Sequence, residues 1–266
     1  MIEYTNTRYH NNFAYYKNDE IIGRSLRNYG EYAQPEVDFL LSIADKLIES
    51  NNGPIVVYDV GSNIGYHATA FASKHAEVYC FEPNPLNYKL LEQNTAKFKN
   101  VHLTQCAVSN QNGTTNIGIF DLDSVSNFGD VHINDQNGVP VTTIRLDDVN
   151  LPNPHIIKID VEGYEYGVML GAEQIIKSYM PMIYYEAQDL RDFDKIWFFL
   201  TRLNYRLYWA VVRNYNINNL NQNTNNIFSN TAIFDVIALP PTMGELSGAL
   251  KVLGPDDNWQ RLCQSI

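Results

Sequence analysis

The 266-residue chain has 19 Lys and Arg residues against 30 Asp and Glu residues, which gives a formal net charge of −11 at pH 7. Hydrophobic residues make up 45% of the chain and charged residues 18%, as in a folded globular protein. Because the sequence contains no basic run that could neutralise a phosphate backbone, this composition argues against nucleic acid as a partner.

The cysteines and the N-terminus predict a cytoplasmic protein. Cys80, Cys106 and Cys263 are odd in number and widely spaced, which predicts neither a disulfide framework nor a zinc site. The N-terminal stretch lacks the basic and then apolar pattern of a signal peptide, and no run of roughly 18 apolar residues occurs. We therefore expect no stable membrane insertion, while a homo-oligomer stays open.

The first element that the sequence predicts is an amphipathic helix over residues 34–50. Val37, Leu40 and Leu41 begin a helical apolar spacing that continues to Ile48, and Pro35 stands in the first turn. We expect residues 1–53 to form an N-terminal cap that ends in this helix.

Strands and helices alternate in the next part of the chain. We predict strands at 54–61, 77–83 and 101–109, and helices at 64–75 and 85–98. This alternation predicts parallel βαβ units, with helices on both faces of one sheet. Residues 110–146 break the rhythm with Gly and Asn around short β-like runs, which indicates a β excursion between strands three and four.

The alternation resumes at residue 156 and brings the expected sheet to seven strands. The predicted elements are a strand that starts at Ile156, a helix at 164–178, a strand at 181–187, a helix from Phe193 to Leu203, and strands at 205–212 and 231–239. An Asn-rich loop at 213–230 separates the last two strands. No linker divides the chain, so we predict a single domain over 1–266, with a core at 54–240 and a C-terminal extension at 241–266.

Two strand ends carry the pattern of a nucleoside site. The first ends in "DVGSNIGYH", where Gly61 and Gly65 would let the backbone approach a ligand, and the second ends in "FEPNP". Glu82 follows Gly61 by 21 residues, a distance that suits hydrogen bonds to ribose hydroxyls. Because Asp59 would repel a phosphate, the pattern favours S-adenosylmethionine over a dinucleotide. The alternative is that both glycines only shape a turn.

These stretches, with "VTTIRLDDV", "IIKIDVEGYEYGVMLGAEQII" and "MIYYEA" in the same order, resemble the FkbM family of S-adenosylmethionine-dependent methyltransferases. The resemblance covers most of the chain. It implies a seven-stranded, Rossmann-like class I methyltransferase fold and O-methylation of hydroxyls on sugars or natural products. It also implies that the cofactor residues include Asp59, Gly61, Asn63, Gly65 and Glu82, and that Asp160 and Glu162 form the family's acidic element.

Neighbouring residues complete the expected site. Around the cofactor we expect Ser62, Tyr66, His67, Pro83, Asn84, Ala107 and Asp160. Because the predicted N-terminal helix packs against the sheet, we also expect the preceding Tyr29, Gly30 and Glu31 to lie over the cofactor.

The acidic residues after the fourth and fifth strands are the candidate catalytic groups. A sugar hydroxyl is a weak acid, so its methylation needs a base or a metal ion. One hypothesis places Mg²⁺ between Asp160 and Glu186. The other, slightly favoured, makes Asp160 or Glu162 the direct base, with His67 or Lys158 nearby. We interpret Lys158 as the partner of a carboxylate and Glu165 as a helix-start charge.

The functional hypothesis is a methyltransferase that produces S-adenosylhomocysteine while methylating a hydroxyl of a nucleotide-linked sugar or glycan precursor. The Asn-rich loop would serve as a sugar-binding lid or would reflect compositional bias alone. Alternatives are a small natural product or an amino or carboxyl group as acceptor, and a nucleoside-binding protein without catalysis.

Overall fold

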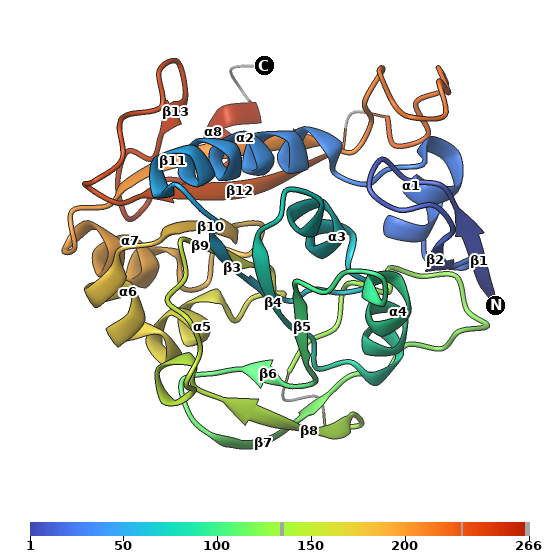
Figure 1. The fold of residues 1–266 in the computed structure, drawn as a ribbon, viewed down its shortest axis with the longest axis horizontal. Coiled ribbons are helices and arrows are strands. Elements are labelled where there is room, and N and C mark those ends of the chain that lie inside the picture. The colour runs from blue at the N-terminus through green and yellow to red at the C-terminus, as the bar shows by residue number, and fades with distance from the viewer. Residues whose placement is uncertain (134–135, 230, 264–266) are drawn as a thin grey trace.

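The computed structural model describes residues 1–133, 136–229 and 231–263. The remaining positions belong to the predicted excursion, the Asn-rich loop and the C-terminal extension, and lie outside the described residues. Figure 1 shows a central twisted sheet between two groups of helices, with a smaller sheet at one edge.

The central sheet contains a strand at each of the seven positions predicted for it. Its order is β13-β11-β12-β10-β9-β3-β4-β5. The strands are β3 (Val56–Val60), β4 (Glu77–Phe81), β5 (Val101–Thr104), β9 (Ile156–Ile159), β10 (Met182–Glu186), β11 (Arg206–Arg213), β12 (Ala232–Leu239) and β13 (Leu250–Lys251). Strands β3, β4, β5, β9 and β10 are parallel, whereas β11, β12 and β13 join through antiparallel pairs.

The described sheet has eight strands, one more than the seven predicted. The additional strand β13 has two residues, pairs with Tyr208 and Trp209 of β11, and lies at the sheet edge. A strand of two residues has no detectable alternation of polar and apolar side chains, so the sequence pattern could not reveal it. The other seven strands follow the spatial order three, two, one, four, five, seven, six.

Helices cover both faces of this sheet, as predicted. On one face, Val57, Ile156 and Met182 pack in a core shared with α2 (Gln34–Asn51), α3 (Tyr66–Ser73) and α4 (Pro85–Thr95). On the other, Tyr58 and Ile157 pack in a core shared with α5 (Glu165–Gly171), α6 (Glu173–Tyr179) and α7 (Phe193–Thr201). Successive strand residues point to opposite faces, so each apolar strand supplies both cores.

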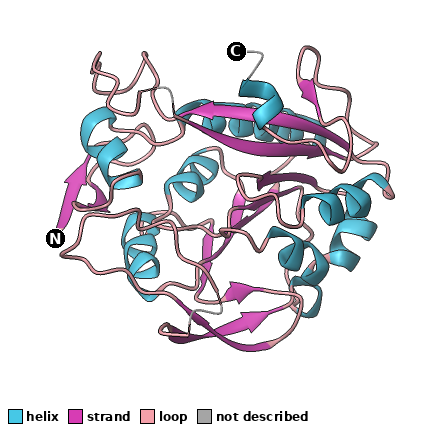
Figure 2. Ribbon diagram, turned by 180° about the vertical axis from the view of Figure 1, so that it is seen from behind, coloured by secondary structure: helices cyan, strands magenta, loops and turns pink. Residues whose placement is uncertain are grey.

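The excursion between strands three and four forms a second sheet, which Figure 2 shows apart from the central strands. Its order is β6-β8-β7, with β6 (Ala107–Val108), β7 (Gly113–Ile117) and β8 (Val139–Ile144). The predicted strand at 101–109 is therefore two strands in different sheets. The short helix η1 (Leu146–Asp148) follows β8.

Some elements depart from the sequence-based expectations. The predicted helix at 164–178 is broken at Ala172, which ends α5 and precedes α6. The N-terminal cap contains the hairpin β1 (Ile2–Thr5) and β2 (Phe13–Tyr16) and the helix α1 (Ile22–Tyr29), and the chain closes with α8 (Gln260–Cys263). Within the described ranges, none of the helices combines the length and apolarity needed to cross a bilayer.

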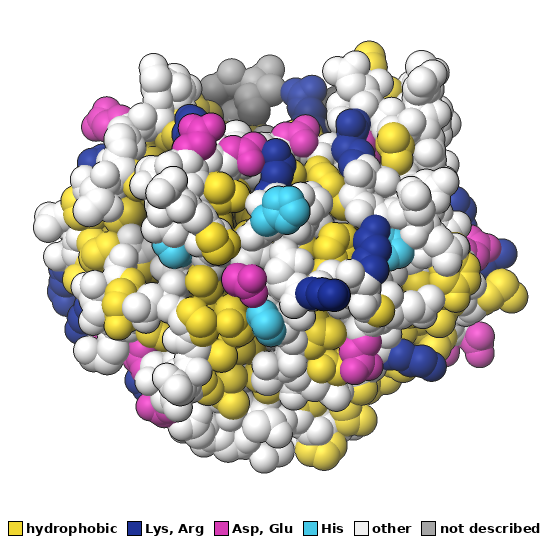
Figure 3. All heavy atoms as spheres, viewed as in Figure 1, with side chains coloured by type: hydrophobic (Ala, Val, Ile, Leu, Met, Phe, Trp, Pro, Cys, Tyr) yellow, Lys and Arg dark blue, Asp and Glu magenta, His cyan; other side chains and the backbone are white. Residues whose placement is uncertain are grey.

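The surface in Figure 3 carries Lys and Arg side chains singly, with Asp and Glu side chains among them. This face therefore has the mixed-charge character expected of an acidic globular protein.

Candidate active site

A cavity of about 380 Å³ opens where the parallel strands end. The order of the sheet reverses between β3 and β9, because β4 and β5 lie on one side of β3 while β9 and β10 lie on the other. Ligands of open α/β sheets bind at such a switch point. The cavity is lined by Gly61, Ser62, Asn63, Tyr66, His67, Glu82, Pro83, Asn84, Ala107, Asp160, Glu162 and Glu186, all of them predicted site residues.

Gly61 brings the end of β3 against the end of β9. It has a φ of +82°, and a Cβ at this position would lie 1.8 Å from the carbonyl oxygen of Asp160. Its N–H donates to the carbonyl of Phe81, 2.9 Å away. Only glycine tolerates both the left-handed backbone and this close approach. The turn after β3 therefore carries no side chain at Gly61, and its backbone lines the cavity, as in a ligand-binding loop.

Glu82 fixes the shape of two loops at once. Its Oε2 accepts the N–H of Asn63 and its Oε1 accepts the N–H of Asn84, both at 2.8 Å. Burial raises the pKa of Glu82 to about 7, although these two donors oppose the shift. The side chain of Asn84 caps α4 by accepting the N–H of Leu86 at 2.9 Å. A buried acid held beside the glycine turn fits the hydroxyls of a ribose.

Five predicted cofactor residues lie outside the lining of the cavity. Asp59 is fully buried and its carboxylate oxygens have no hydrogen-bond partner; burial raises its pKa. It stands directly beside Lys158 in the β3 and β9 register. Gly65 precedes the first turn of α3 with a φ of +89°. The remaining three are Tyr29, Gly30 and Glu31.

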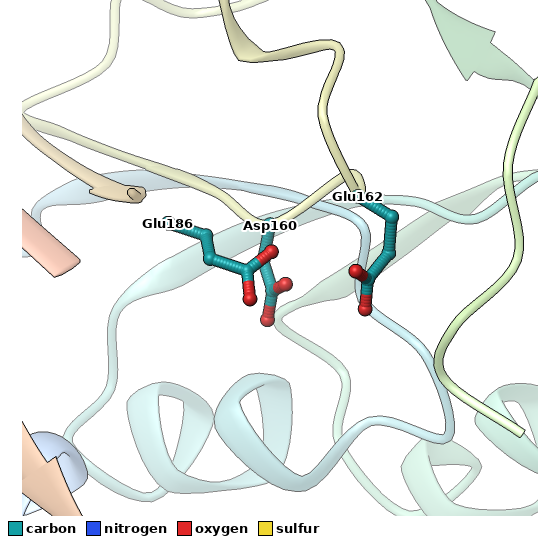
Figure 4. A group of neighbouring side chains, drawn as sticks. All are labelled: Asp160, Glu162 and Glu186. Carbon is teal, nitrogen blue, oxygen red and sulfur yellow. The ribbon is translucent and has the colours of Figure 1, made fainter. Parts of the chain in front are cut away.

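Three carboxylates converge in the cavity. Asp160, Glu162 and Glu186 each offer an oxygen, and these oxygens lie within 4.8 Å of one another. In Figure 4 the side chains of Asp160 and Glu186 lie side by side, and that of Glu162 lies on the other side of Asp160. All three carboxylate groups point in the same direction. Burial and the charge of Asp160 raise the pKa of Glu162 to about 8 and that of Glu186 to about 10. The cluster therefore favours any positive charge placed among these oxygens.

The backbone at Glu162 is strained. Glu162 has a φ of +53° and Gly163 follows with +86°. A left-handed conformation is uncommon for a residue other than glycine, and such outliers gather at functional sites. Glu165, buried in the first turn of α5, accepts the N–H of Gly163 at 3.1 Å and so supports this turn. Burial raises the pKa of Glu165 to about 7, and this acid at the start of the helix also supports the loop before it.

Lys158 is the predicted partner of a carboxylate, and the structure confirms this. Its Nζ lies 2.9 Å from Oδ2 of Asp160. Burial opposes the charged ammonium, but Asp160, Asp59 and Glu36 more than compensate and raise the pKa of Lys158. The lysine thus stays charged beneath the carboxylate cluster.

Two further acids, which were not among the predicted site residues, also line the cavity. Oε1 of Glu36 lies 3.0 Å from Nε2 of His67, and Asp235 accepts a hydrogen bond from the hydroxyl of Tyr184 at 2.7 Å. Burial raises the pKa of Asp235. In the sequence, Glu36 looks like an ordinary acid in the first turn of a helix. Asp235, by contrast, is a single carboxylate inside the apolar run "TAIFDVIAL", and this pattern indicates a buried functional residue.

Hydrogen bonds join the Asn-rich loop to the N-terminal cap. Glu31 is 2% exposed and accepts hydrogen bonds from Arg8, from the side chain of Asn216 and from the N–H of Leu220. The hydroxyl of Tyr29 donates to the carbonyl of Asn225. From the cap, Ile21, Ile22 and Tyr32 line the cavity; from the described part of the predicted loop, Asn214 does so.

The strand order and the glycine turn at the switch point define a class I, Rossmann-like methyltransferase fold. The family profile described as "Methyltransferase FkbM domain" matches residues 59–207. The chain belongs to this FkbM methyltransferase family, as its motifs predicted, and the family's cofactor is S-adenosylmethionine.

Two similar proteins are named as methyltransferases. The chain is 29% identical over 137 residues to the hexuronic acid methyltransferase AglP of Haloferax volcanii, covering 50% of this chain and 56% of AglP. It is 26% identical over 155 residues to the 2-O-methyltransferase NoeI of Sinorhizobium fredii, covering 50% of this chain and 63% of NoeI. The chain thus aligns with little more than half the length of these relatives.

Among solved structures, a methyltransferase FkbM from Methylobacillus flagellatus is 16% identical with a TM-score of 0.46, over 69% of this chain and 43% of that one. A precorrin-6y C5,15-methyltransferase from Geobacter metallireducens is 16% identical with a TM-score of 0.42, over 70% of this chain and 80% of that one.

Proposed function

We propose that the chain is an S-adenosylmethionine-dependent O-methyltransferase that acts on a hydroxyl of a sugar. One observation carries the proposal: the cavity joins a glycine turn and the ribose-type acid Glu82 to a carboxylate cluster at Asp160, Glu162 and Glu186. The names of the two curated relatives, which specify a hexuronic acid and a 2-O position, support a sugar acceptor.

The cavity residues divide the work of methyl transfer. Gly61, Asn63 and Glu82 hold the nucleoside and its methionine part, so that the sulfonium methyl faces the acceptor. We assign the acceptor proton to the ionised form of Glu162, because a pKa of about 8 makes that carboxylate a stronger base than an ordinary one. Lys158 bonds to Asp160 next to it, and the carboxylate of Asp160 favours the cationic cofactor.

A divalent cation is the alternative means of activating the hydroxyl. The carboxylate oxygens of Asp160, Glu162 and Glu186 lie close enough to hold Mg²⁺, which prefers oxygen ligands. Bound there, the ion would lower the pKa of a coordinated hydroxyl. A chelator separates the two routes, since full activity after its addition contradicts a role for Mg²⁺.

The acceptor we propose is a nucleotide-linked sugar or a glycan precursor made in the cytoplasm. The free thiols of Cys80, Cys106 and Cys263 support a reducing compartment.

The test is the mass of candidate sugars after incubation with the enzyme and S-adenosylmethionine. We expect one added methyl group, and a loss of at least about a hundredfold in rate for Glu162→Gln, as for removal of a general base. Glu92→Gln, an exposed acid on α4, is the matched control. Binding of the cofactor without turnover on any sugar would instead indicate a nucleoside-binding protein.

A further inference from the structure

Asn87 is a buried residue of the cavity wall whose amide oxygen has no partner. It stands in the first turn of α4, lines the cavity and is 3% exposed. Among the described residues, none donates a hydrogen bond to its Oδ1. Buried polar side chains nearly always have a partner, so an amide oxygen without one indicates a donor that the protein itself does not supply.

The other polar side chains of the stretch "EPNPLN" are held by the protein. Both oxygens of Glu82 accept backbone N–H groups. The Oδ1 of Asn84 accepts the N–H of Leu86 at 2.9 Å, and its Nδ2 donates to the carbonyl of Gly118 at 3.2 Å. Asn87 differs from both, because the oxygen of its side chain has no such partner in the described chain. It is therefore free to bind a ligand.

Asn87 lies beside the acid that we assign to the ribose. Its N–H donates to the Oδ1 of Asn84 at 3.4 Å, and the N–H of Asn84 donates to Glu82 at 2.8 Å. Cys106 borders the same place, because its N–H and that of Glu82 both donate to the carbonyl of Thr104. The base of a nucleoside is bonded directly to its ribose, so a ribose at Glu82 brings the base to this end of the cavity.

Apolar side chains from neighbouring segments complete this end of the cavity. They flank Glu82, lie at or after residue 106, or precede Gly118 in the chain, and they are Phe81, Pro83, Cys106, Ala107, Val108 and Ile117. Such a site holds a flat ring by apolar contact and distinguishes it by a few polar groups. An amide offers an acceptor and a donor side by side, and this pattern pairs with the 6-amino group and a ring nitrogen of adenine.

We propose that Asn87 recognises the adenine of S-adenosylmethionine, with its amide oxygen accepting from the 6-amino group and its amide nitrogen donating to the neighbouring ring nitrogen. The inference rests on the cofactor of the proposed function and is independent of the acceptor. It makes Asn87 the residue that selects an adenine nucleoside over one whose base lacks the amino group.

Two ligands and one substitution test the proposal. Calorimetry would give the Kd of the wild type and of Asn87→Leu for S-adenosylhomocysteine and for its analogue with purine in place of adenine, which lacks the 6-amino group. For the wild type we expect the analogue to bind about tenfold more weakly, because it leaves the buried oxygen of Asn87 unpaired. For Asn87→Leu we expect about tenfold weaker binding of S-adenosylhomocysteine, and the preference for it over the analogue should disappear or reverse.

A structural role for Asn87 predicts a different result. Because its amide oxygen has no partner in the described part of the chain, Asn87→Leu should leave the unfolding temperature of the ligand-free protein unchanged or raise it. Gln93→Leu is the control, since it removes an exposed amide of the same helix outside the cavity lining and should leave both Kd values unchanged.

Three results would overturn the inference. The first is a wild type that binds both ligands equally. The second is an Asn87→Leu variant that keeps the wild-type preference, with or without a lower unfolding temperature. In the third, the wild type does not bind S-adenosylhomocysteine at all, which contradicts the proposed function itself, and the inference falls with it.

Discussion

The ammonium of Lys158 lies 2.9 Å from the carboxylate of Asp160, and the two residues stand on the same face of the sheet at the end of β9. The lysine side chain is 3% exposed and that of the aspartate is 41% exposed. The ion pair therefore joins the buried interior to the open cavity. In the proposed function, this ion pair lies where donor and acceptor would meet.

Loss of this ammonium should destabilise the protein. For Lys158→Met we expect the free energy of unfolding to fall by about 2 kcal/mol, less than for a fully buried pair, because water screens Asp160. Urea denaturation measures the change. Lys74→Met is the control, since Lys74 forms a pair of similar length with Asp45 at 2.8 Å but both side chains are more than a third exposed. Equal losses of stability in the two variants would contradict a larger contribution from the buried Lys158.

The turn at Gly61 should admit no side chain. In Gly61→Ala a Cβ would lie 1.8 Å from the Asp160 carbonyl, so β3 and β9 could not keep their spacing. We expect unfolding at a markedly lower temperature and no measurable binding of S-adenosylhomocysteine. Gly53→Ala is a matched control, because no heavy atom lies within 4 Å of that Cβ. Cofactor binding by Gly61→Ala at wild-type affinity would show that the turn adapts.

Glu82 should contribute to cofactor affinity beyond its role in shaping the loops. Glu82→Gln keeps one oxygen acceptor but loses the other, and a ribose hydroxyl would lose a charged partner. We expect the Kd for S-adenosylhomocysteine to rise about tenfold or more in calorimetry. Glu77→Gln, at the start of the strand that precedes Glu82, removes a more exposed acid and should have no effect. An unchanged Kd for Glu82→Gln would remove Glu82 from the ribose site.

The carboxylate cluster should make stability depend on pH. The folded protein holds protons on Glu162 and Glu186 that the unfolded chain releases near pH 4.5, because the pKa values are raised to about 8 and about 10. This contribution is complete below pH 4.5 and is lost as the pH rises toward those values. Asp160, Asp235, Glu165 and Lys158 also face Glu186 or its neighbours and modify the slope.

Glu186→Gln should therefore remove this acid's share of the decline in the free energy of unfolding between pH 5 and pH 8, which is on the order of 4 kcal/mol for one proton retained across three pH units. Urea titrations at both pH values measure it, with Glu92→Gln as the control. An identical decline in the Glu186 variant and the wild type would mean that this carboxyl is ionised in the folded protein.

Glu31 should fasten the Asn-rich loop to the N-terminal cap. Glu31→Gln exchanges a buried charge with three donors for a neutral amide, so we expect faster hydrogen exchange in the loop and a loss of about 1–2 kcal/mol in stability. Glu20→Gln, an exposed acid of the same cap, should leave both unchanged. Unaltered exchange in the loop would contradict the contact.

The sequence by itself determined the parallel core and its glycine turn, because strand periodicity, Gly61 and the acids after each strand are local features of the chain. It also determined the family, because the family's motifs and their order along the chain can be recognised without knowledge of the fold. Only the tertiary structure decided which side chains meet. Glu36 joins the cavity because α2 packs against α3 and β11, and Asp235 joins it because β12 returns antiparallel beside β10.

The same holds for the elements that the sequence misplaced. The sequence predicts one strand over residues 101–109, yet Thr104 ends a strand of the central sheet and Ala107 begins a strand of the second sheet. The asparagines of the loop looked like ligand donors, but many of their amides bond to the loop itself and to the cap. Such partners lie far apart in the chain, so the free energy of their pairing is set by packing and long-range hydrogen bonds, which no local pattern encodes.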